Sequence, residues 1–182
     1  MGLISDIPGA LKELLRLVNN IFSRPSAQIK KVVRIYDSLH SIVDNTDVHR
    51  VVIVKAHNSG GLIKPHTPLY ITALYEDYSH PMESIKSKWF KVEVDEEYVR
   101  ILLQLCKERK VKFVVKDMKP SMLRDAYLSS GIKYGELHLL GQDGKNIYFC
   151  SIVSMWEEGW ANSVSQSVAI DLAVNTIRNN II

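Results

Sequence analysis

The chain opens with an apolar stripe at helical spacing. Hydrophobic residues recur in steps of three and four at Leu3, Ile7, Leu11, Leu14, Val18 and Ile21. That spacing places them on one side of a helix, with polar residues on the other side. Pro25 disfavours helical geometry at Arg24, and Ser26 can cap a new helix. The pattern therefore predicts an amphipathic helix over residues 1–24, separated by a break from a domain over residues 25–182.

A second helix is predicted from Ser26 to Asn45. Its apolar side would be formed by Ile29, Val32, Val33, Tyr36, Leu39 and Val43. After this helix, β-branched runs and alternating apolar residues predict strands at 50–56, 69–75, 111–115, 134–140 and 146–155. Helical spacing returns from Asp95, over 120–129 and over 161–181. The Asp-Gly pair between the last two strands is typical of a hairpin turn.

We expect these elements to share one hydrophobic core that is centred on the sheet. The strands would contribute Val51, Ile53, Ile71, Phe113, Leu137, Leu139, Tyr148 and Ile152. The helices would contribute Val33, Leu102 and Leu172.

The composition is that of an ordinary globular protein. The chain has 182 residues, of which 46% are hydrophobic and 24% charged, enough to build a core without disulfides or metals. A net charge of +3 is too small to indicate nucleic-acid binding. No uncharged stretch approaches the ~20 residues that a membrane-spanning helix needs. Cys106 and Cys150 lie in apolar runs, which suits buried thiols in a reducing compartment. We therefore expect a cytoplasmic protein that does not bind nucleic acid.

The order of these elements and several segments of the chain resemble the GAF family. The segments VVKDM, SMLRDAYLSSG and GIKYGELHLLGQDGKNIYFCSIV, with the helix that follows, are similar to the closing section of a GAF domain. RVVIVKAHNSGG and PLYITALYE are similar to its opening strands, in a form associated with proteins of bacteria and their phages. The resemblance covers roughly residues 26–181. It implies an α/β (α+β) fold, a central antiparallel sheet with helices packed on one side, to which this chain adds the amphipathic N-terminal helix.

The resemblance also implies a sensory or regulatory domain that binds a small ligand or another protein. The sequence has neither the cysteine of bilin-binding members nor the Asn-Lys-Phe-Asp-Glu signature of cyclic-nucleotide members, so neither ligand is implied.

Polar residues surround the predicted connection between the first two strands. His57 and Asn58 begin this connection, His66 lies near its end, and Glu76 follows the second strand. If the two strands pair, the four side chains could form one polar rim that contacts a small ligand. Two imidazoles and a carboxylate are also metal-ligand types, but their spacing matches no known metal motif, so we expect no metal. Asn58 and the glycines after it could instead serve only the turn.

Other candidate ligand contacts lie near strand ends. A pocket is expected between the sheet and the covering segment 77–91, close to Tyr75, Asp117 and Trp156. Asp117 could instead cap the short helix that follows it, and Trp156 could join Trp160 in closing the core. His138 lies inside a strand, where a satisfied or solvent-facing histidine is expected.

No catalytic motif is present in the sequence. There is no Ser-His-Asp arrangement with a nucleophile elbow, no Walker loop and no GxGxxG. We therefore expect a non-catalytic domain without a cofactor. An alternative is a phage-encoded or bacterial structural or docking protein, in which the GAF-like body is an empty scaffold and the N-terminal helix serves assembly or attachment to a membrane surface.

The N-terminal stripe needs a surface to cover it. Leu11, Leu14, Val18 and Ile21 would otherwise expose a continuous apolar patch. The helix could fold back on its own domain, pair with a second copy or make peripheral contact with a membrane, although its polar side lacks the Lys/Arg richness of membrane-surface helices. Terminal helices often join subunits in GAF-like proteins, so the resemblance implies a homo-oligomer, a dimer, that forms through this helix.

Overall fold

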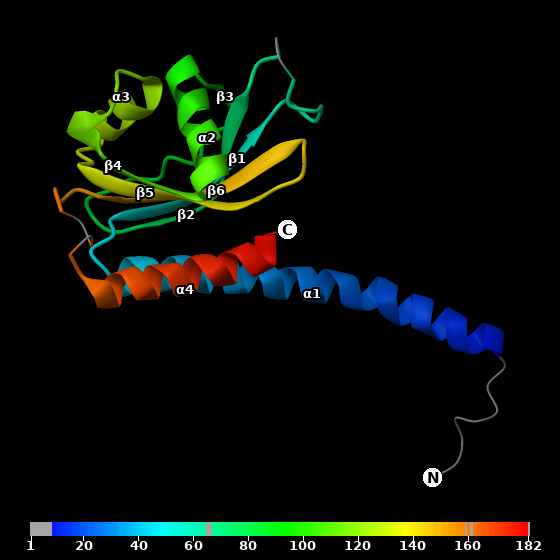
Figure 1. The fold of residues 1–182 in the computed structure, drawn as a ribbon. Helices are drawn as coiled ribbons and strands as arrows, with labels where there is room; N and C mark the ends of the chain where they lie inside the picture. The colour runs from blue at the N-terminus through cyan, green and yellow to red at the C-terminus, as the bar shows by residue number, and fades with distance from the viewer. Residues whose placement is uncertain (1–8, 65–66, 159, 161, 182) are drawn as a thin grey trace.

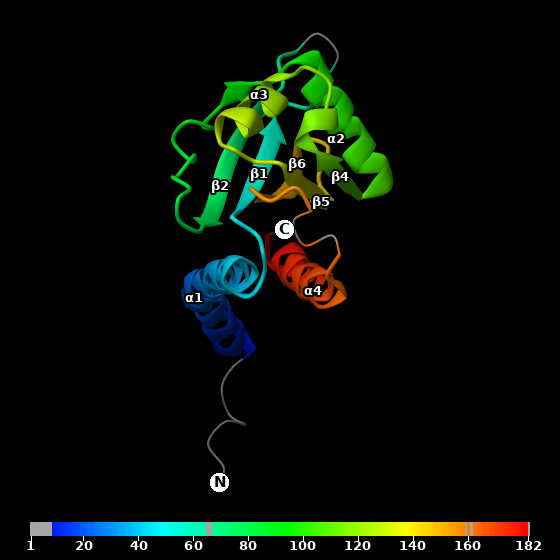
Figure 2. The same ribbon diagram turned by 90° about the vertical axis from the view of Figure 1, so that its left-hand side faces the viewer.

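A six-stranded antiparallel sheet lies between two pairs of helices in the computed structural model (Figure 1, Figure 2). The structure describes residues 9–64, 67–158, 160 and 162–181, with side chains from residue 25 onward. The elements are α1 (Gly9–Asn45), β1 (Arg50–His57), β2 (Tyr70–Tyr78), β3 (Val92–Glu93), α2 (Glu96–Glu108), β4 (Lys110–Val114), the 3₁₀ helix η1 (Val115–Asp117), α3 (Met122–Ser129), β5 (Tyr134–Gln142), β6 (Asn146–Ser154) and α4 (Val164–Ile181).

The strands follow the order β3-β2-β1-β6-β5-β4, and each neighbouring pair is antiparallel. Strand β1 therefore lies in the interior of the sheet, paired with β2 on one side and β6 on the other. Its successive side chains alternate between the two faces, and Val51, Val52, Ile53 and Val54 are all buried. A strand covered on both faces needs apolar residues at odd and even positions alike, which explains its continuous β-branched run.

Helices cover both faces of the sheet. Helices α1 and α4 lie side by side on one face, as expected, while α2 and α3 lie on the opposite face (Figure 1, Figure 2). The prediction of one shared core is wrong, because the sheet separates two cores. Val51 and Ile53 pack toward α1 and α4 in one core, and Val52 and Val54 pack toward α2 and α3 in the other.

Helix α1 is continuous from Gly9 to Asn45, with Pro25 inside it. The predicted interruption at 23–26 is therefore wrong. A proline removes one backbone hydrogen bond and disfavours helical geometry at the preceding residue, but long helical segments on both sides can maintain the helix. In Figure 1 the N-terminal part of α1 continues well past the sheet and past the end of α4.

The predicted inward faces of two helices are also wrong. Val33 and Leu172 are exposed, and α1 instead buries Ile35, Leu39 and Ile42. Apolar residues occur on several sides of α1, so periodicity alone does not show which side meets the sheet. Of the other predicted core residues, those on the strands and Leu102 are buried, except for Phe113 and Tyr148, which are partly buried against the two cores.

Local signals identified most boundaries correctly. Asp95 caps α2 by accepting a hydrogen bond from the backbone N–H of Tyr98. The β5–β6 hairpin turns at Asp143, whose carboxylate accepts the N–H groups of Lys145 and Asn146. The two-residue strand β3 was not predicted, because its pairing with β2 is too short to leave a periodic pattern. Within the described residues, every helix is too short or too polar to cross a bilayer.

Truncating a core residue and an exposed residue tests this layer arrangement. Ile53 is completely buried, so Ile53→Ala should lower the free energy of unfolding by about 2–5 kcal/mol. Leu172 is 64% exposed, and Leu172→Ala should change it by less than about 0.5 kcal/mol in a monomeric sample. Urea unfolding of both variants measures the difference. Equal losses would contradict the placement of α4.

Candidate functional site

Arg50 is a buried cation at the start of β1. It lies on the same face of the strand as Val52 and Val54, toward α2 and α3, and only 4% of its surface is exposed. Its Nη2 donates to the backbone carbonyl of Glu83 at 2.7 Å. Its Nε is buried and has no hydrogen-bond partner among the described residues. Burial lowers the pKa of the guanidinium, although the negative charge of Glu76 opposes this shift.

Arg50 lines a small inner cavity between the sheet and α2 and α3. The cavity measures about 30 Å³, room for one or two water molecules. Its polar wall includes the hydroxyls of Tyr127 and Ser151, which lie 2.9 Å apart in a hydrogen bond. Burial raises the pKa of Tyr127 to about 12, so its phenol is neutral at physiological pH. The remaining wall consists of Val52, Val54, Ala73, Ile85, Trp89, Tyr98, Leu123 and Val153.

A larger outer pocket also reaches Arg50. It measures about 630 Å³, within the range of small-molecule sites. Arg50 and Ile85 line both spaces. The other residues around the outer pocket are Pro81, Met82, Glu83, Lys88, Ser129, Ser130, Gly131 and Met155. We call the outer pocket together with the inner cavity the Arg50 site.

The segment 79–91 covers the Arg50 site and is held by several hydrogen bonds. Glu76 accepts from the hydroxyl of Ser84 and from the backbone N–H of Ile85 at 3.0 Å. The backbone carbonyl of Trp89 accepts from the N–H of Ala73 at 2.8 Å. Together with the bond from Arg50 to Glu83, these contacts position the segment above β1 and β2.

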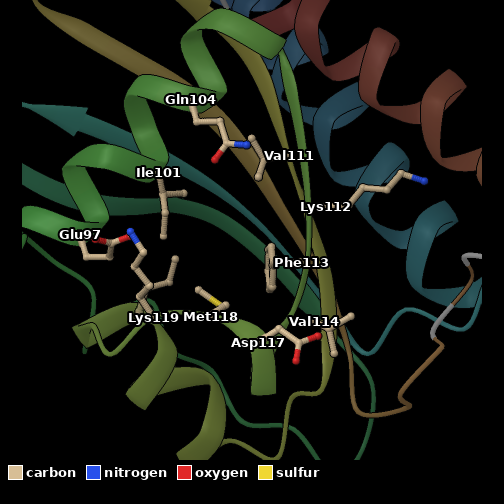
Figure 3. Close-up of a pocket in the computed structure, with 11 residues that line it drawn as sticks. Glu97, Ile101, Gln104, Val111, Lys112, Phe113, Val114, Asp117, Met118 and Lys119 are labelled. Atoms are coloured by element: carbon tan, nitrogen blue, oxygen red, sulfur yellow. The ribbon is translucent and has the colours of Figure 1, made fainter.

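A second pocket lies beside the edge strand β4. It measures about 290 Å³ and is bounded by α2, β4, η1 and the start of α3 (Figure 3). Phe113 lies at its base and stacks on Tyr127 at a ring distance of 5.2 Å. On its rim, Lys119 forms an ion pair with Glu97 at 3.7 Å. Its charged groups are exposed or paired, so this pocket has no unsatisfied buried group to receive a ligand.

A buried ion cluster lies on the other face of the sheet, around Glu136 of β5. The carboxylate is 1% exposed and contacts Lys110 at 2.9 Å and Lys112 at 3.2 Å. His138 lies 2.9 Å away and the hydroxyl of Tyr134 lies 3.0 Å away. Burial would raise the pKa of Glu136, but hydrogen bonds from His138 and Lys110 outweigh it and hold that pKa well below its ordinary value. Lys110 also pairs with Asp171 of α4 at 3.3 Å, so the cluster ties α4 to the sheet edge.

Solved structures share this architecture across most of the chain. The GAF domain of a two-component sensor histidine kinase from Bacillus halodurans superposes with a TM-score of 0.53 at 11% identity, covering 84% of this chain and 91% of that one. The GAF domain region of a putative membrane protein from Geobacter sulfurreducens gives 0.53 at 15% identity, covering 90% and 99%. A GAF domain from Synechocystis in its photoproduct state gives 0.54 at 8% identity, covering 81% and 90%. The chain has a GAF-like fold. No protein-family model and no curated protein matches the sequence.

The GAF-like fold separates the residues predicted to form one polar rim. His57 pairs with Tyr70 in the sheet, whereas Glu76 pairs with Val52. The two therefore lie roughly 17 Å apart along the strands, and the single rim is wrong. An antiparallel pairing places the end of β1 beside the start of β2, not beside its end. His66 lies outside the described residues.

His57 and Asn58 have local structural partners. The Nδ1 of His57 accepts from the backbone N–H of Ser59, which leaves Nε2 to donate to Thr72 at 2.9 Å. Burial, with Lys55 and Lys91 nearby, lowers the pKa of His57 and favours this neutral form. Asn58 donates to the carbonyl of Leu62 across the turn. Both residues stabilise the β1–β2 connection.

The other predicted ligand contacts do not line the Arg50 site. Tyr75 lies on the opposite face of the sheet, where its ring meets Tyr36 of α1. Asp117 is at the β4 pocket (Figure 3), and Trp156 is exposed and packs edge-on against His49. Glu76 holds the covering segment, and its negative charge acts on Arg50. The expected position of a pocket beneath segment 77–91 is confirmed, but the predicted lining is wrong. Tyr75 faces the opposite layer, and Asp117 and Trp156 lie outside the strands that line the site.

Trp160 and His138 were expected to stabilise the fold, and both have partners within it. Trp160 is buried in the core beside α1 and α4 and meets Tyr134 edge-on. His138 is satisfied by Glu136, as expected for a strand histidine. The side chains of Leu11, Leu14, Val18 and Ile21 lie outside the described residues.

Arg50, Tyr127 and Ser151 were not predicted as site residues. A signal was available for Arg50, because alternation along β1 places it on the same face as Val52 and Val54. Tyr127 and Ser151 come from α3 and β6, so their meeting depends on how α3 packs on the sheet. In the part of the chain that the structure describes, no three His, Cys, Asp or Glu side chains gather as metal ligands.

Replacing Glu136 tests the ion cluster. Glu136→Gln should lower the free energy of unfolding at pH 7 by roughly 3 kcal/mol, because it leaves two lysines without their shared counterion. The folded pKa of Glu136 lies below its unfolded value, so its stabilisation is fully present above about pH 4.5 and is lost as the pH falls. Urea unfolding at pH 7 and at pH 3 should therefore show a smaller difference between variant and wild type at pH 3.

The exposed Glu93→Gln on β3 is the matched control and should leave stability nearly unchanged at both pH values. A Glu136→Gln protein as stable as wild type at pH 7 would show that the cluster does not stabilise the fold.

Proposed function

We propose that the chain is a non-catalytic sensory or regulatory domain that binds a small ligand at the Arg50 site. The observation that carries this proposal is the meeting of an unsatisfied buried guanidinium with two buried hydroxyls in a mainly apolar pocket. Ligand sites are commonly apolar clefts with a few polar groups that orient the ligand. The GAF-like fold supports the same class, since one of the structures named above belongs to a sensor histidine kinase.

The two spaces suggest how a ligand would be held. The outer pocket has the volume of a small-molecule site, while the inner cavity admits little more than water. A ligand would occupy the outer pocket and reach Arg50, and entry of a larger group would require Ile85 and Trp89 to move. Because segment 79–91 is held by a few hydrogen bonds, it is the part of the site best able to adjust.

Strand β1 gives ligand binding a route to the other face of the sheet. Val52 and Val54 line the inner cavity, whereas Val51 and Ile53 pack against the terminal helices. A ligand that shifts β1 would therefore change the packing of α1 and α4. No observation favours the alternative of an empty scaffold in a phage structural protein.

Obstructing the outer pocket tests the ligand-binding proposal. Ser129 is exposed at the pocket, and Ser129→Trp should place an indole in the space that a ligand would occupy. Native mass spectrometry of freshly purified protein, followed by an NMR screen with a library of charged and neutral fragments, should find ligands that shift the amide signals of β1 and segment 79–91. The variant should bind the same ligands with at least about tenfold lower affinity.

Ser165→Trp on the opposite face is the matched control and should bind as the wild type does. If no fragment shifts these signals and no ligand is retained, the domain does not use this pocket.

We also propose that the domain forms a homodimer through α1 and α4. On their sides away from the sheet, these helices expose Ile29, Val33, Val164, Val168 and Leu172. The exposed fractions include 63% for Ile29 and 80% for Val164, and such surfaces are often covered by a partner. Helix α1 also extends beyond the body of the domain, where a second copy could pack along it (Figure 1).

Charged substitutions on α1 test the dimer. Ile29→Glu with Val33→Glu should convert the protein to a folded monomer, because two carboxylates would be buried at the interface. Leu128→Glu on α3 is the control, since Leu128 is equally exposed but lies on the other face, and it should remain dimeric. Sedimentation velocity at micromolar concentration measures the state. A wild-type monomer would refute the dimer, and a monomer that floats with lipid vesicles would favour peripheral membrane contact.

A further inference from the structure

Arg50 makes no ion pair within the part of the chain that the structure describes. Its guanidinium donates one hydrogen bond among these residues, to the uncharged carbonyl of Glu83. Glu76 lies on the same face of the sheet, one position diagonally across, but its carboxylate is occupied by segment 84–86. A buried charge without a counterion is strongly unfavourable unless something else supplies the missing interaction.

Glu136 shows how this chain treats a buried charge that serves the fold. Its carboxylate has two lysines, a histidine and a tyrosine hydroxyl within 3.2 Å. Arg50 is equally buried but keeps Nε unpaired. Arg124 and Trp160 also keep one buried nitrogen unpaired among the described residues, but only Arg50 lines the site described above. This position favours a partner for Arg50 from outside the chain.

The neighbouring polar groups can add a further donor beside Arg50. The hydrogen bond between Tyr127 and Ser151 uses one of their two hydroxyl hydrogens, so the pair can still donate one. Lys88 contributes a second positive charge to the outer pocket. The one acidic residue there, Glu83, faces Arg50 with its backbone carbonyl.

We propose that the Arg50 site takes a small organic carboxylate with an apolar body, an inference that rests on the proposed ligand-binding function. Two donors, the Nε–H of Arg50 and a hydroxyl of the Tyr127–Ser151 pair, match the two oxygens of a carboxylate. Met82, Ile85 and Met155 offer an apolar surface to the rest of the molecule. A phosphate has more oxygens to satisfy and no apolar part, so this lining suits it less well.

NMR titration of the full-length protein tests the ligand class. The probes are sodium isobutyrate and sodium phenylacetate, each compared with its uncharged amide, and inorganic phosphate, up to about 10 mM. The carboxylates should shift the amide signals of Arg50, Ile85 and Ser130 saturably. The amides and phosphate should bind at least about tenfold more weakly, because they lack the charge or the apolar body.

Variants of Arg50 connect the binding to the guanidinium. Arg50→Gln should abolish the carboxylate shifts, whereas Lys145→Gln, which removes a positive charge from the distant hairpin, should leave them unchanged. If Arg50→Gln does not fold, Arg50→Lys decides. It retains the charge and a donor for the Glu83 carbonyl, and it should weaken binding roughly tenfold because the Nε–H donor is lost.

The outcomes separate this inference from the proposed function. Equal binding of acids and amides, or stronger binding of phosphate, would overturn the carboxylate class while leaving a small-ligand site in place. Binding of acids that survives in Arg50→Gln would also overturn it. The absence of any shift with the two acids would overturn the carboxylate class, and the broader fragment screen would then decide whether the site binds anything.

Discussion

Strand β1 lies in the interior of the sheet with helices against both of its faces, so every side chain along it must match a buried environment. Five of its eight residues are apolar and buried, namely Val51 to Val54 and Ala56. Burial on both faces removes water as a partner for any polar group placed there. Arg50 at one end and His57 at the other are therefore the positions where the strand must find specific partners.

The polar side chains at the two ends of β1 find their partners in different ways. His57 is fully engaged by Ser59 and Thr72, and its lowered pKa keeps it neutral in that environment. Arg50 holds segment 79–91 through Glu83 and retains an unpaired Nε. The first arrangement closes a turn. The second leaves a charged donor beside a pocket, and this difference is why we assign the function to Arg50.

The other face of the sheet is organised around the terminal helices. The Glu136 cluster reaches Asp171 through Lys110 and so ties α4 to the strand β4. Helix α4 lies beside α1, and both keep apolar residues on their outward sides. We propose a ligand site on one face of the sheet and a subunit contact on the other. The single layer of strands between them connects the two surfaces.

The sequence by itself determined the elements that depend on neighbouring residues. The strands at 50–57 and 146–154, the cap at Asp95 and the turn at Asp143 follow from local periodicity and side-chain hydrogen bonding, and they were predicted. The continuation of α1 through Pro25 was not, since the helical segments around one proline decide whether it breaks a helix. Only the tertiary structure placed Glu76 away from His57, turned Ile35 instead of Val33 toward the sheet, and brought Tyr127 to Ser151 beside Arg50. These outcomes depend on strand pairing and on the packing of distant layers, and a local pattern of apolar and polar residues does not carry that information.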